Sequence, residues 1–355
     1  MRKLKIGYIP ISKIVSAAGD RRRLEFWANS RGHEVVNVID ESADVIVATV
    51  NADLNLNRYV KYKKPVIFDL VDAYFLPSNF MNDFTRGILK NINGQISGKL
   101  KPFSKSVWEF AERADAVICS SPEQMEVISE VNSNTHVILD SHEEFPILVP
   151  RTNDSKKFST VNLLWEGQPA TIKGFKAISK VLEKLSEDIK LKIDLVTDEK
   201  YFRLLNKYFV SETISLVEND LRKCSSEVSI IPWSVRNVTI TAEKSDFGVL
   251  PLDLSQPIQK LKPENRLLIM WRLGLPVITS ETQAYARVAR EVGVKVSCKN
   301  EIEWEATLKE FINNPCMAEE QVRLGQKYIK EVHSKEKLLE KWDQAVRSVV
   351  PNYGF

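Results

Sequence analysis

The segment KPENRLLIMWRLGLPVITS, from Lys262 to Ser280, is the most informative part of the sequence. It predicts a helix that begins near Pro263–Glu264 after a polar loop, ends at Gly274 and leads into a short apolar strand. A proline in the first turn and a glycine at the end are common in helices. Because a polar loop, a helix and a buried strand follow one another, the segment favours an α/β fold.

The same segment offers a binding site for a diphosphate. The N-terminus of a helix carries unpaired N–H groups and a partial positive charge, and both favour anions. The backbone N–H groups of Glu264 and Asn265 would act together with the charges of Lys262 and Arg266. An ordinary helix end, with Glu264 complementing the helix dipole, explains the same residues without a ligand. Taken alone, the segment leaves both interpretations open.

A second segment, LLWEGQPATIKGF, runs from Leu163 to Phe175. It leads from a strand through Gly167 and Gln168 to Lys173 at the start of a helix. Glycine lets a ligand approach the backbone closely, and a lysine at this place could reach a phosphate. The alternative is an ordinary connection between strand and helix with a solvated lysine. We expect these residues to bind the same anion as the first segment.

Short apolar runs alternate with helical patterns along the whole chain. Strands are expected in the first half at Leu4–Ile9, Glu34–Val38, Val45–Thr49, Val66–Leu70, Ala116–Ser120 and His136–Leu139. In the second half they are expected at Val161–Trp165, Lys192–Thr197, Val228–Pro232, Phe247–Leu250, Pro276–Thr279 and Val294–Ser297. Helices are expected at Leu24–Ser30, Phe175–Leu185 and Asn265–Leu273. This alternation predicts two doubly wound, Rossmann-like α/β domains.

The domain boundary is expected in the turn-rich stretch Phe145–Phe158, which contains Pro146, Pro150, Asn153, Asp154 and Ser155. We therefore predict an N-terminal domain at 1–150 and a C-terminal domain at 151–333. The remaining residues, 334–355, contain an amphipathic helix at about Ser334–Val349, which we expect to pack back towards the N-terminal domain.

Composition excludes several classes of protein. The chain has 355 residues, 43% of them hydrophobic, and a net charge of +3, which is too small to indicate nucleic-acid binding. No G-x-G-x-x-G follows the first strand and no P-loop motif occurs. Cys119, Cys224, Cys298 and Cys316 are scattered, which suits neither a zinc site nor a disulfide framework. Without a long apolar run or an export signal at its start, the chain is expected to be cytoplasmic.

An ordered set of motifs resembles the GT-B glycosyltransferases, in particular the retaining family-4 enzymes. In the second half the set comprises Gly167…Lys173-Gly174, SDFGVLPL at Ser245–Leu252 and GLPVITS at Gly274–Ser280. In the first half it comprises Gly19, RGHEV at Arg31–Val35, VIFDL at Val66–Leu70 and ADAVICSS at Ala114–Ser121. The resemblance covers nearly the whole chain.

The resemblance implies two Rossmann-like domains that face each other across a cleft, with the acceptor on the first domain and the donor on the second. It implies transfer of a sugar from a nucleotide-sugar donor, UDP- or GDP-linked, to a sugar or lipid-linked acceptor in surface polysaccharide or glycoconjugate synthesis. The chain contains no D-x-D motif, and such enzymes generally work without a metal or other cofactor. Lys173, Lys262 and Arg266 would stabilise the departing nucleoside diphosphate. The implied outcome is retention.

Three positions depart from the family-4 pattern. Leu261 and Ile269 stand where those enzymes carry paired glutamates, although Glu264 lies on the same loop. Gln168 stands where an arginine is usual.

The residues expected on the acceptor side come from the first half. Asp72 follows a strand and is predicted to contact the acceptor or the transferred sugar, with helix capping as the alternative. His142 precedes the linker and is a second catalytic candidate, although a lone histidine is more often structural. Gly19 and Asp20 in the first loop are expected to approach the acceptor.

Two basic regions have alternative interpretations. Arg21–Arg23 is expected to be a solvated helix face or a site for an anionic acceptor. The region 88–105 interleaves apolar residues with lysines, either as an insertion packed on the N-terminal domain or as an amphipathic surface for the inner leaflet of a membrane.

Two other functions stay open. A nucleotide-sugar epimerase would use the same fold, but it would need several acidic and histidine residues around the sugar, and the chain has four histidines. A non-catalytic scaffold that binds nucleotide sugars would explain the missing glutamates.

Overall fold

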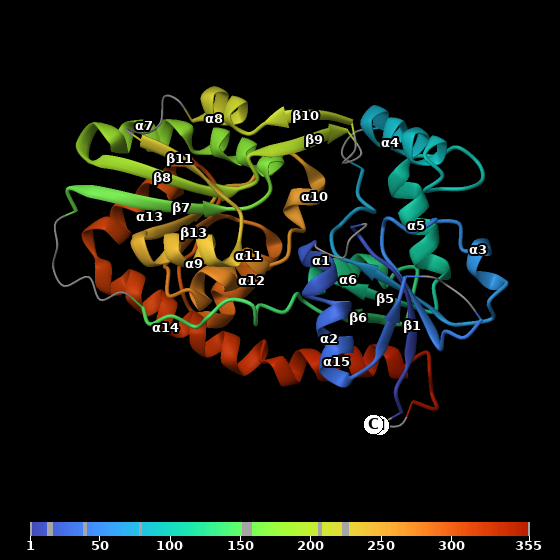
Figure 1. The fold of residues 1–355 in the computed structure, drawn as a ribbon. Coiled ribbons are helices and arrows are strands. Elements are labelled where there is room, and N and C mark those ends of the chain that lie inside the picture. Colours follow the sequence, from blue (N-terminus) through green and yellow to red (C-terminus); the bar gives the residue numbers. More distant parts are fainter. Residues whose placement is uncertain are drawn as a thin grey trace. The chain divides into compact units, whose positions relative to one another are not determined.

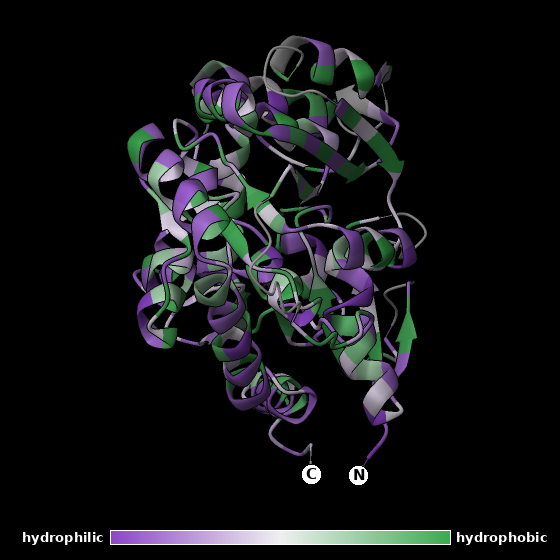
Figure 2. Ribbon diagram, turned by 90° about the vertical axis from the view of Figure 1, so that its left-hand side faces the viewer, coloured by the Kyte–Doolittle hydropathy of each residue, from purple (hydrophilic) through white to green (hydrophobic). Residues whose placement is uncertain are grey.

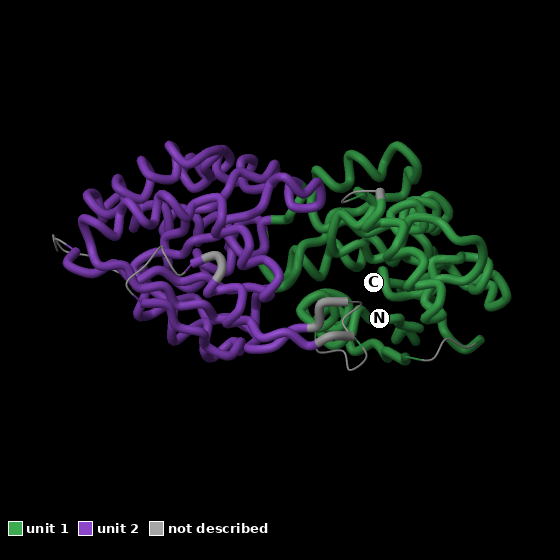
Figure 3. The backbone as a smooth tube through the Cα atoms, turned by 90° about the horizontal axis from the view of Figure 1, so that it is seen from above, with its two compact units in different colours: residues 1–141, 261–263, 333–355 green, residues 142–260, 264–332 purple. Residues whose placement is uncertain are grey.

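The computed structural model describes residues 2–12, 17–37, 41–77, 80–150, 158–204, 208–221 and 227–353. The chain forms two compact units (Figure 3). Unit 1 comprises Met1–Ser141, Leu261–Pro263 and His333–Phe355, and unit 2 comprises His142–Lys260 and Glu264–Val332. The first change of unit comes after Ser141, earlier than the 150/151 boundary that turn-rich composition suggested.

Unit 1 is built on a six-stranded parallel sheet (Figure 1). Its strands are β1 (Lys5–Ile9), β2 (Glu34–Val36), β3 (Val45–Ala48), β4 (Val66–Leu70), β5 (Ala116–Cys119) and β6 (Thr135–Val137). Their order in the sheet is β2-β1-β3-β4-β5-β6. The residues of β3, β4 and β5 are all buried, because helices cover both faces of a parallel sheet.

The helices of unit 1 are α1 (Ala18–Arg21), α2 (Leu24–Arg31), α3 (Asn57–Val60), α4 (Phe80–Ile92), α5 (Phe103–Arg113), α6 (Pro122–Ile128) and α15 (Lys335–Arg347). Helix α15 packs on α2 through Trp342, which stacks on Trp27 with ring centroids 5.6 Å apart. The indole nitrogen of Trp27 donates a hydrogen bond of 2.7 Å to Asp343. The last helix of the chain is therefore part of the core of unit 1.

Unit 2 is built on a second six-stranded parallel sheet, in the order β11-β8-β7-β12-β13-β14. Its strands are β7 (Thr160–Glu166), β8 (Lys190–Thr197), β11 (Glu227–Pro232), β12 (Phe247–Leu250), β13 (Val277–Ser280) and β14 (Ser297–Cys298). A separate antiparallel hairpin consists of β9 (Lys200–Leu204) and β10 (Tyr208–Glu212).

The helices of unit 2 are the 3₁₀ helix η1 (Pro169–Ala177), α7 (Ser179–Asp188), α8 (Ile214–Asp220), α9 (Val235–Lys244), α10 (Pro257–Lys260), α11 (Asn265–Arg272), α12 (Gln283–Val292), α13 (Glu301–Asn313) and α14 (Pro315–Val332). Figure 2 shows hydrophilic and hydrophobic residues interleaved along the helices, as expected for helices that cover a sheet. Gly325 of α14 lies so close to Trp271 of α11 that an added Cβ would be 2.2 Å from the indole ring. No side chain larger than hydrogen fits there.

The predicted α/β class is confirmed, and so are eleven of the twelve predicted strands of the two sheets, with shifts at their ends. Three local expectations were wrong. The hairpin β9–β10 was not predicted, and the helix expected from Phe175 begins at Ser179 after η1. The last strand lies at Ser297–Cys298 instead of Val294–Ser297. Val38, Cys224 and the part of the expected linker at 151–157 lie outside the described residues.

Within the described ranges, no helix combines the length and the apolar content that crossing a membrane requires.

Candidate functional site

The centre of the unit 2 sheet is the natural place for a ligand. Strand β7 lies between β8 and β12, and the chain proceeds from β7 first to β8 and β11 on one side, then to β12, β13 and β14 on the other. Such a reversal of strand order leaves a crevice at the carboxyl ends of the two central strands, where α/β proteins bind their ligands. In unit 2 this position is where β7 ends at Glu166 and β12 ends at Leu250.

Arg266 of α11 packs against the backbone at the end of β7. Gly167 has a φ of 156°, and a Cβ added there would lie 3.2 Å from the guanidinium carbon of Arg266. The Nε of Arg266 donates to Glu166 Oε1 at 3.3 Å, and its Nη2 donates to the Glu166 carbonyl oxygen. The guanidinium carbon lies 5.1 Å from the centre of the Trp165 ring. A glycine is needed here because the arginine occupies the space of a side chain.

Glu166 orients the arginine and was not predicted from the sequence. It is 6% exposed, and its Oε2 accepts a hydrogen bond of 3.2 Å from the Trp233 indole. In the sequence, the feature that could have indicated a role for Glu166 is its place at the end of an apolar strand, directly before Gly167.

The connection after β7 approaches the end of β12. An added Cβ at Gly174 would lie 2.2 Å from the Pro251 carbonyl oxygen, so this glycine allows η1 to pack against the backbone. Lys173, directly before it, is exposed. Gln168 is exposed as well, and its carbonyl oxygen accepts the Thr171 N–H at 2.9 Å.

Helix α11 begins at Asn265, with Glu264 as its N-cap residue and no side-chain capping hydrogen bond. Glu264 is 2% exposed and accepts a hydrogen bond of 2.8 Å from Arg287 of α12, so it anchors the helix. The Asn265 side-chain oxygen lies 3.0 Å from His142 Nε2. The structure thus brings two candidate residues together within unit 2 and gives Glu264 a structural partner.

In unit 1, Asp72 forms an ion pair with Lys262. Asp72 Oδ1 also accepts the Ala73 N–H at 3.0 Å. The Gln124 side chain, near the start of α6, donates to the Leu261 carbonyl oxygen at 3.1 Å. These contacts hold the segment Leu261–Pro263 on unit 1, and in this structure the charge of Lys262 is balanced by Asp72.

Asp20 organises the loop after β1. It is fully buried and accepts hydrogen bonds from the Tyr8 hydroxyl at 2.6 Å, the Ile11 N–H at 2.7 Å and the Ser12 N–H at 3.0 Å. Burial, together with the Asp20 charge, raises the pKa of Tyr8. Gly19 packs under Ile11, whose Cδ1 would lie 2.4 Å from an added Cβ. Both residues therefore have structural partners, and their role towards an acceptor stays a prediction.

The expectation of a solvated face at Arg21–Arg23 was wrong for Arg22, which is 8% exposed, and for Arg23, which is fully buried. Arg23 has acidic partners. Its guanidinium forms an ion pair of 2.5 Å with Asp69 at the end of β4. It also lies 3.3 Å from Asp140 and donates to the Ile138 carbonyl oxygen at 2.5 Å. Three acceptors from distant parts of the chain offset the cost of removing this cation from water.

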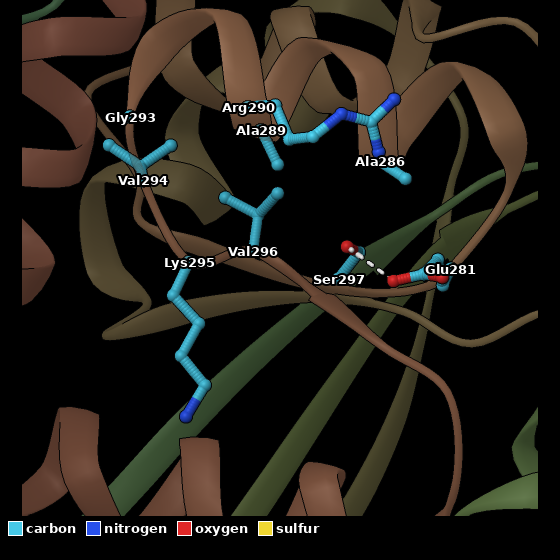
Figure 4. A pocket seen from close by; sticks show the side chains of 9 residues that line it. All are labelled: Glu281, Ala286, Ala289, Arg290, Gly293, Val294, Lys295, Val296 and Ser297. Carbon is cyan, nitrogen blue, oxygen red and sulfur yellow. Dashed lines mark hydrogen bonds between the residues drawn. The ribbon is translucent and has the colours of Figure 1, made fainter.

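A pocket of about 430 Å³ lies elsewhere in unit 2, between α12 and the edge strand β14 (Figure 4). It is lined by Glu281, Ala286, Ala289, Arg290, Gly293, Val294, Lys295, Val296 and Ser297. Its lining includes none of the predicted site residues, and the carboxyl ends of β7 and β12 are the better candidate on topological grounds. Among the described residues, no group of three or more His, Cys, Asp or Glu side chains is arranged to hold a metal ion.

Several solved structures have the same fold at low sequence identity. WaaG, a glycosyltransferase involved in lipopolysaccharide biosynthesis, is 12% identical with a TM-score of 0.52, over 99% of this chain and 100% of that chain. MnaA of S. aureus, solved with UDP, is 10% identical with a TM-score of 0.53, over 98% of this chain and 96% of that chain.

A mutant of S. aureus TarM, in complex with Fondaparinux, alpha-GlcNAc-glycerol and UDP, is 14% identical with a TM-score of 0.53 over 85% of this chain. The match spans about half of that chain, 55% of its length. No protein-family model and no curated protein sequence matches this sequence. These similarities confirm the predicted GT-B fold, with its two parallel-sheet α/β units.

Proposed function

We propose that this protein is a glycosyltransferase that takes a sugar from a nucleotide-sugar donor bound to unit 2. The observation that carries the proposal is the contact between Arg266 and Gly167 at the carboxyl end of β7, next to the strand-order reversal. An arginine fixed by a buried glutamate at this place is suited to a diphosphate. The UDP complexes of the TarM mutant and of MnaA, two proteins of the same fold, support this choice of ligand.

The proposed chemistry is stabilisation of the leaving diphosphate by fixed positive groups. Arginine has five N–H donors, and among the described residues Arg266 uses only Nε and Nη2 for hydrogen bonds, both to Glu166. Its outer nitrogen would donate to the β-phosphate. The N-terminus of α11 and the exposed Lys173 would add further positive charge. No metal or other cofactor enters this proposal.

The finer parts of the proposal concern the acceptor and the outcome. We propose a sugar or lipid-linked acceptor in surface polysaccharide or glycoconjugate synthesis, with Asp72 and His142 as its catalytic candidates. The donor nucleotide would be UDP or GDP and the transfer would retain the anomeric configuration. Support comes from the ordered sequence motifs and from the activity of WaaG, whose whole length this chain matches.

A thermal-shift series with UDP, GDP, ADP, TDP and CMP tests the donor site. A ligand that binds only the folded protein raises its melting temperature. We expect UDP or GDP to stabilise the wild type, Lys173→Ala to reduce the shift, and Arg266→Gln to remove most of it. Lys176→Ala is the matched control, because Lys176 is another exposed lysine of η1. Absence of a shift with every nucleotide at millimolar concentration would reject the donor site.

Turnover separates the enzyme from a non-catalytic scaffold. With the matching nucleotide sugar, an enzyme releases nucleoside diphosphate, and EDTA leaves the rate unchanged if no metal is needed. An epimerase would instead change the configuration of the sugar without an acceptor. A nucleotide that binds without any turnover would favour the scaffold. NMR analysis of the anomeric configuration of the product then decides between retention and inversion.

Peripheral contact with the inner membrane is part of the proposal for lipid-linked acceptors. Met81, Ile92 and Leu100 are apolar residues of unit 1 that are 71%, 74% and 56% exposed. In contrast, three residues of the same region are buried, namely Lys90, Ile96 and Phe103. The region 88–105 therefore does not form a continuous basic amphipathic face. Cosedimentation with anionic vesicles, compared for the wild type and Ile92→Ser, tests the contact.

A further inference from the structure

Helix α4 places two cations on one face, at Arg86 and Lys90, four residues apart. Lys90 is 3% exposed, and its Nζ donates to the Val50 carbonyl oxygen at 3.3 Å and to Asn51 Oδ1 at 3.2 Å. Burial and the nearby charge of Arg86 lower the pKa of Lys90 to about 8. A lysine in these surroundings carries its charge at neutral pH at a cost in stability.

Arg86 is a half-buried cation held by aromatic rings. Its guanidinium carbon lies 4.2 Å from the centre of the Phe103 ring and 5.2 Å from that of Tyr74. An added Cβ at the neighbouring Gly87 would lie 2.0 Å from the Lys101 carbonyl oxygen, so α4 sits directly on the backbone that leads to Phe103. This close packing places Arg86 of α4 beside the Phe103 ring.

The carboxylates near these two cations are engaged elsewhere. In the part of the chain that the structure describes, no carboxylate lies within ion-pair distance of Arg86 or Lys90. Asp83, one helical turn before Arg86, accepts from the Ser104 N–H at 3.0 Å and from its hydroxyl. Asp72 pairs with Lys262. Burial lowers the pKa of Arg86, as expected for a cation without a matching anion.

Lys90 lies at the edge of the unit 1 sheet where its parallel strands have their carboxyl ends. Val50 and Asn51 follow the carboxyl end of β3, and the Asn51 side-chain nitrogen donates to the Ile11 carbonyl oxygen in the loop after β1. Strand β1 lies between β2 and β3, so the order of the strands reverses at this point. Unit 1 therefore has its own crevice position between β1 and β3, and Lys90 reaches it.

We propose that Arg86 and Lys90 form a binding site for an anionic oxygen group, a phosphate or a carboxylate, carried by the acceptor. The inference rests on the proposed function, which it extends by naming the chemical class of the acceptor. The bound anion accepts hydrogen bonds from the outer guanidinium nitrogens of Arg86 and from Nζ of Lys90. It also relieves the repulsion between two like charges in a poorly solvated place.

The test measures binding of inorganic phosphate and of glucuronate by thermal shift, at constant ionic strength, with and without saturating UDP. We expect at least one anion to raise the melting temperature, equally with and without UDP. Arg86→Gln should lower the affinity for that anion by about tenfold or more, since a charged hydrogen-bond donor is lost. Lys105→Gln, which removes an exposed lysine of α5, should leave the affinity unchanged. Binding of phosphate would indicate a phosphorylated acceptor, and binding of glucuronate would indicate an acidic sugar.

Three outcomes would overturn the inference. The anion effect could disappear when UDP is bound, which would place the anion at the donor site of unit 2. It could persist in full in Arg86→Gln, with circular dichroism showing that the variant is folded. It could also be absent for both anions. These three outcomes can be told from failure of the proposed function. If the proposed function fails, no nucleotide binds, and this result does not depend on whether an anion binds.

Discussion

The protonation of Lys90 should make the free energy of unfolding depend on pH. Its pKa falls from 10.5 to about 8 on folding because of burial and the charge of Arg86. Between these two values the unfolded chain holds the proton and the folded protein does not, so stability from this group rises with pH across that window. Below pH 8 the folded protein carries the full cost of a buried charge. Tyr74 and Phe103 supply no negative charge beside the two cations at neutral pH. The nearby carboxylates accept from Ser104 in the case of Asp83 and pair with Lys262 in the case of Asp72.

We therefore expect Lys90→Met to stabilise the protein at pH 7 by roughly 1 to 2 kcal/mol, after allowance for two lost hydrogen bonds. The advantage over the wild type should shrink as the pH rises from 8 to about 10.5. Urea unfolding at pH 7, 8.5 and 10 measures this, with Lys105→Met as the exposed control. An equal loss of stability at every pH would show that the hydrogen bonds of Lys90 outweigh its desolvation.

Gly167 gives a second prediction at a single residue. An added Cβ would lie 3.2 Å from the Arg266 guanidinium, the flexible end of a long side chain, so Gly167→Ala should displace the arginine, and the φ of 156° should add a cost of about 1 kcal/mol in stability. We expect the nucleotide-dependent thermal shift to fall by at least half. Gly293→Ala is the matched control, because Gly293 has a positive φ of 76° with nothing within 4 Å of an added Cβ. It should lose about 1 kcal/mol of stability and keep nucleotide binding.

Asp20 gives a third prediction at a single residue. Its carboxylate accepts hydrogen bonds from Tyr8, Ile11 and Ser12. Asp20→Ala would leave several buried donors without an acceptor and should lower the free energy of unfolding by about 3 kcal/mol or more. Thermal and urea unfolding measure the change. If the variant keeps wild-type stability but loses turnover, Asp20 acts on the acceptor and the structural interpretation is wrong.

Among the elements, α15 joins unit 1 from the far end of the sequence. Trp342 is 1% exposed and stacks on Trp27 of α2, so Trp342→Ala should lower the stability of unit 1 by about 4 kcal/mol. Gln344→Ala, an exposed position on the same helix, should change it by less than about 0.5 kcal/mol. Differential scanning calorimetry of the two variants checks this, and equal melting profiles would contradict the packing role of α15.

The elements could be predicted because strands buried on both faces of a parallel sheet are written as short apolar runs. Val45–Ala48 and Val277–Ser280 show this most clearly, since all their residues are buried. The hairpin β9–β10 lies outside the two main sheets, and its strands KYFRL and YFVSE mix aromatic, aliphatic and charged residues, so neither strand is a continuous aliphatic run of that kind. An α-helix was expected from Phe175, but the chain forms the 3₁₀ helix η1 there. The local sequence could not show this, because it does not reveal the close contact of Gly174 with Pro251.

The candidate site was harder to predict than the fold. Gly167 and Arg266 were named from motifs, but their contact depends on tertiary packing. The burial of Arg23 depends on Asp69 and Asp140, which are 46 and 117 residues away along the chain. The depressed pKa of Lys90 likewise depends on α4 packing against Phe103. Sequence patterns show which residues are charged, and only the fold shows which charges lack a counter-ion.

At the scale of the whole molecule, the two units should respond separately to loss of the C-terminal segment. A chain that ends at Val332 lacks the segment His333–Phe355 of unit 1 and leaves unit 2 without any missing residue. We expect it to lose the melting transition of unit 1 and to keep a nucleotide-dependent transition of unit 2. Calorimetry with and without UDP measures both. A single transition that disappears altogether would show that unit 2 depends on unit 1 for its stability.

The discontinuity of unit 1 matters during synthesis of the chain. The Trp27 face emerges early from the ribosome, but its partner Trp342 is translated 315 residues later. At about 5 to 20 residues per second, that interval lasts roughly 15 to 60 s. Unit 2 ends at Val332, so all of it has been translated before α15 exists. The nascent protein therefore exposes an unfinished apolar face while its second half can already fold, and that face is where we expect a ribosome-associated chaperone to bind.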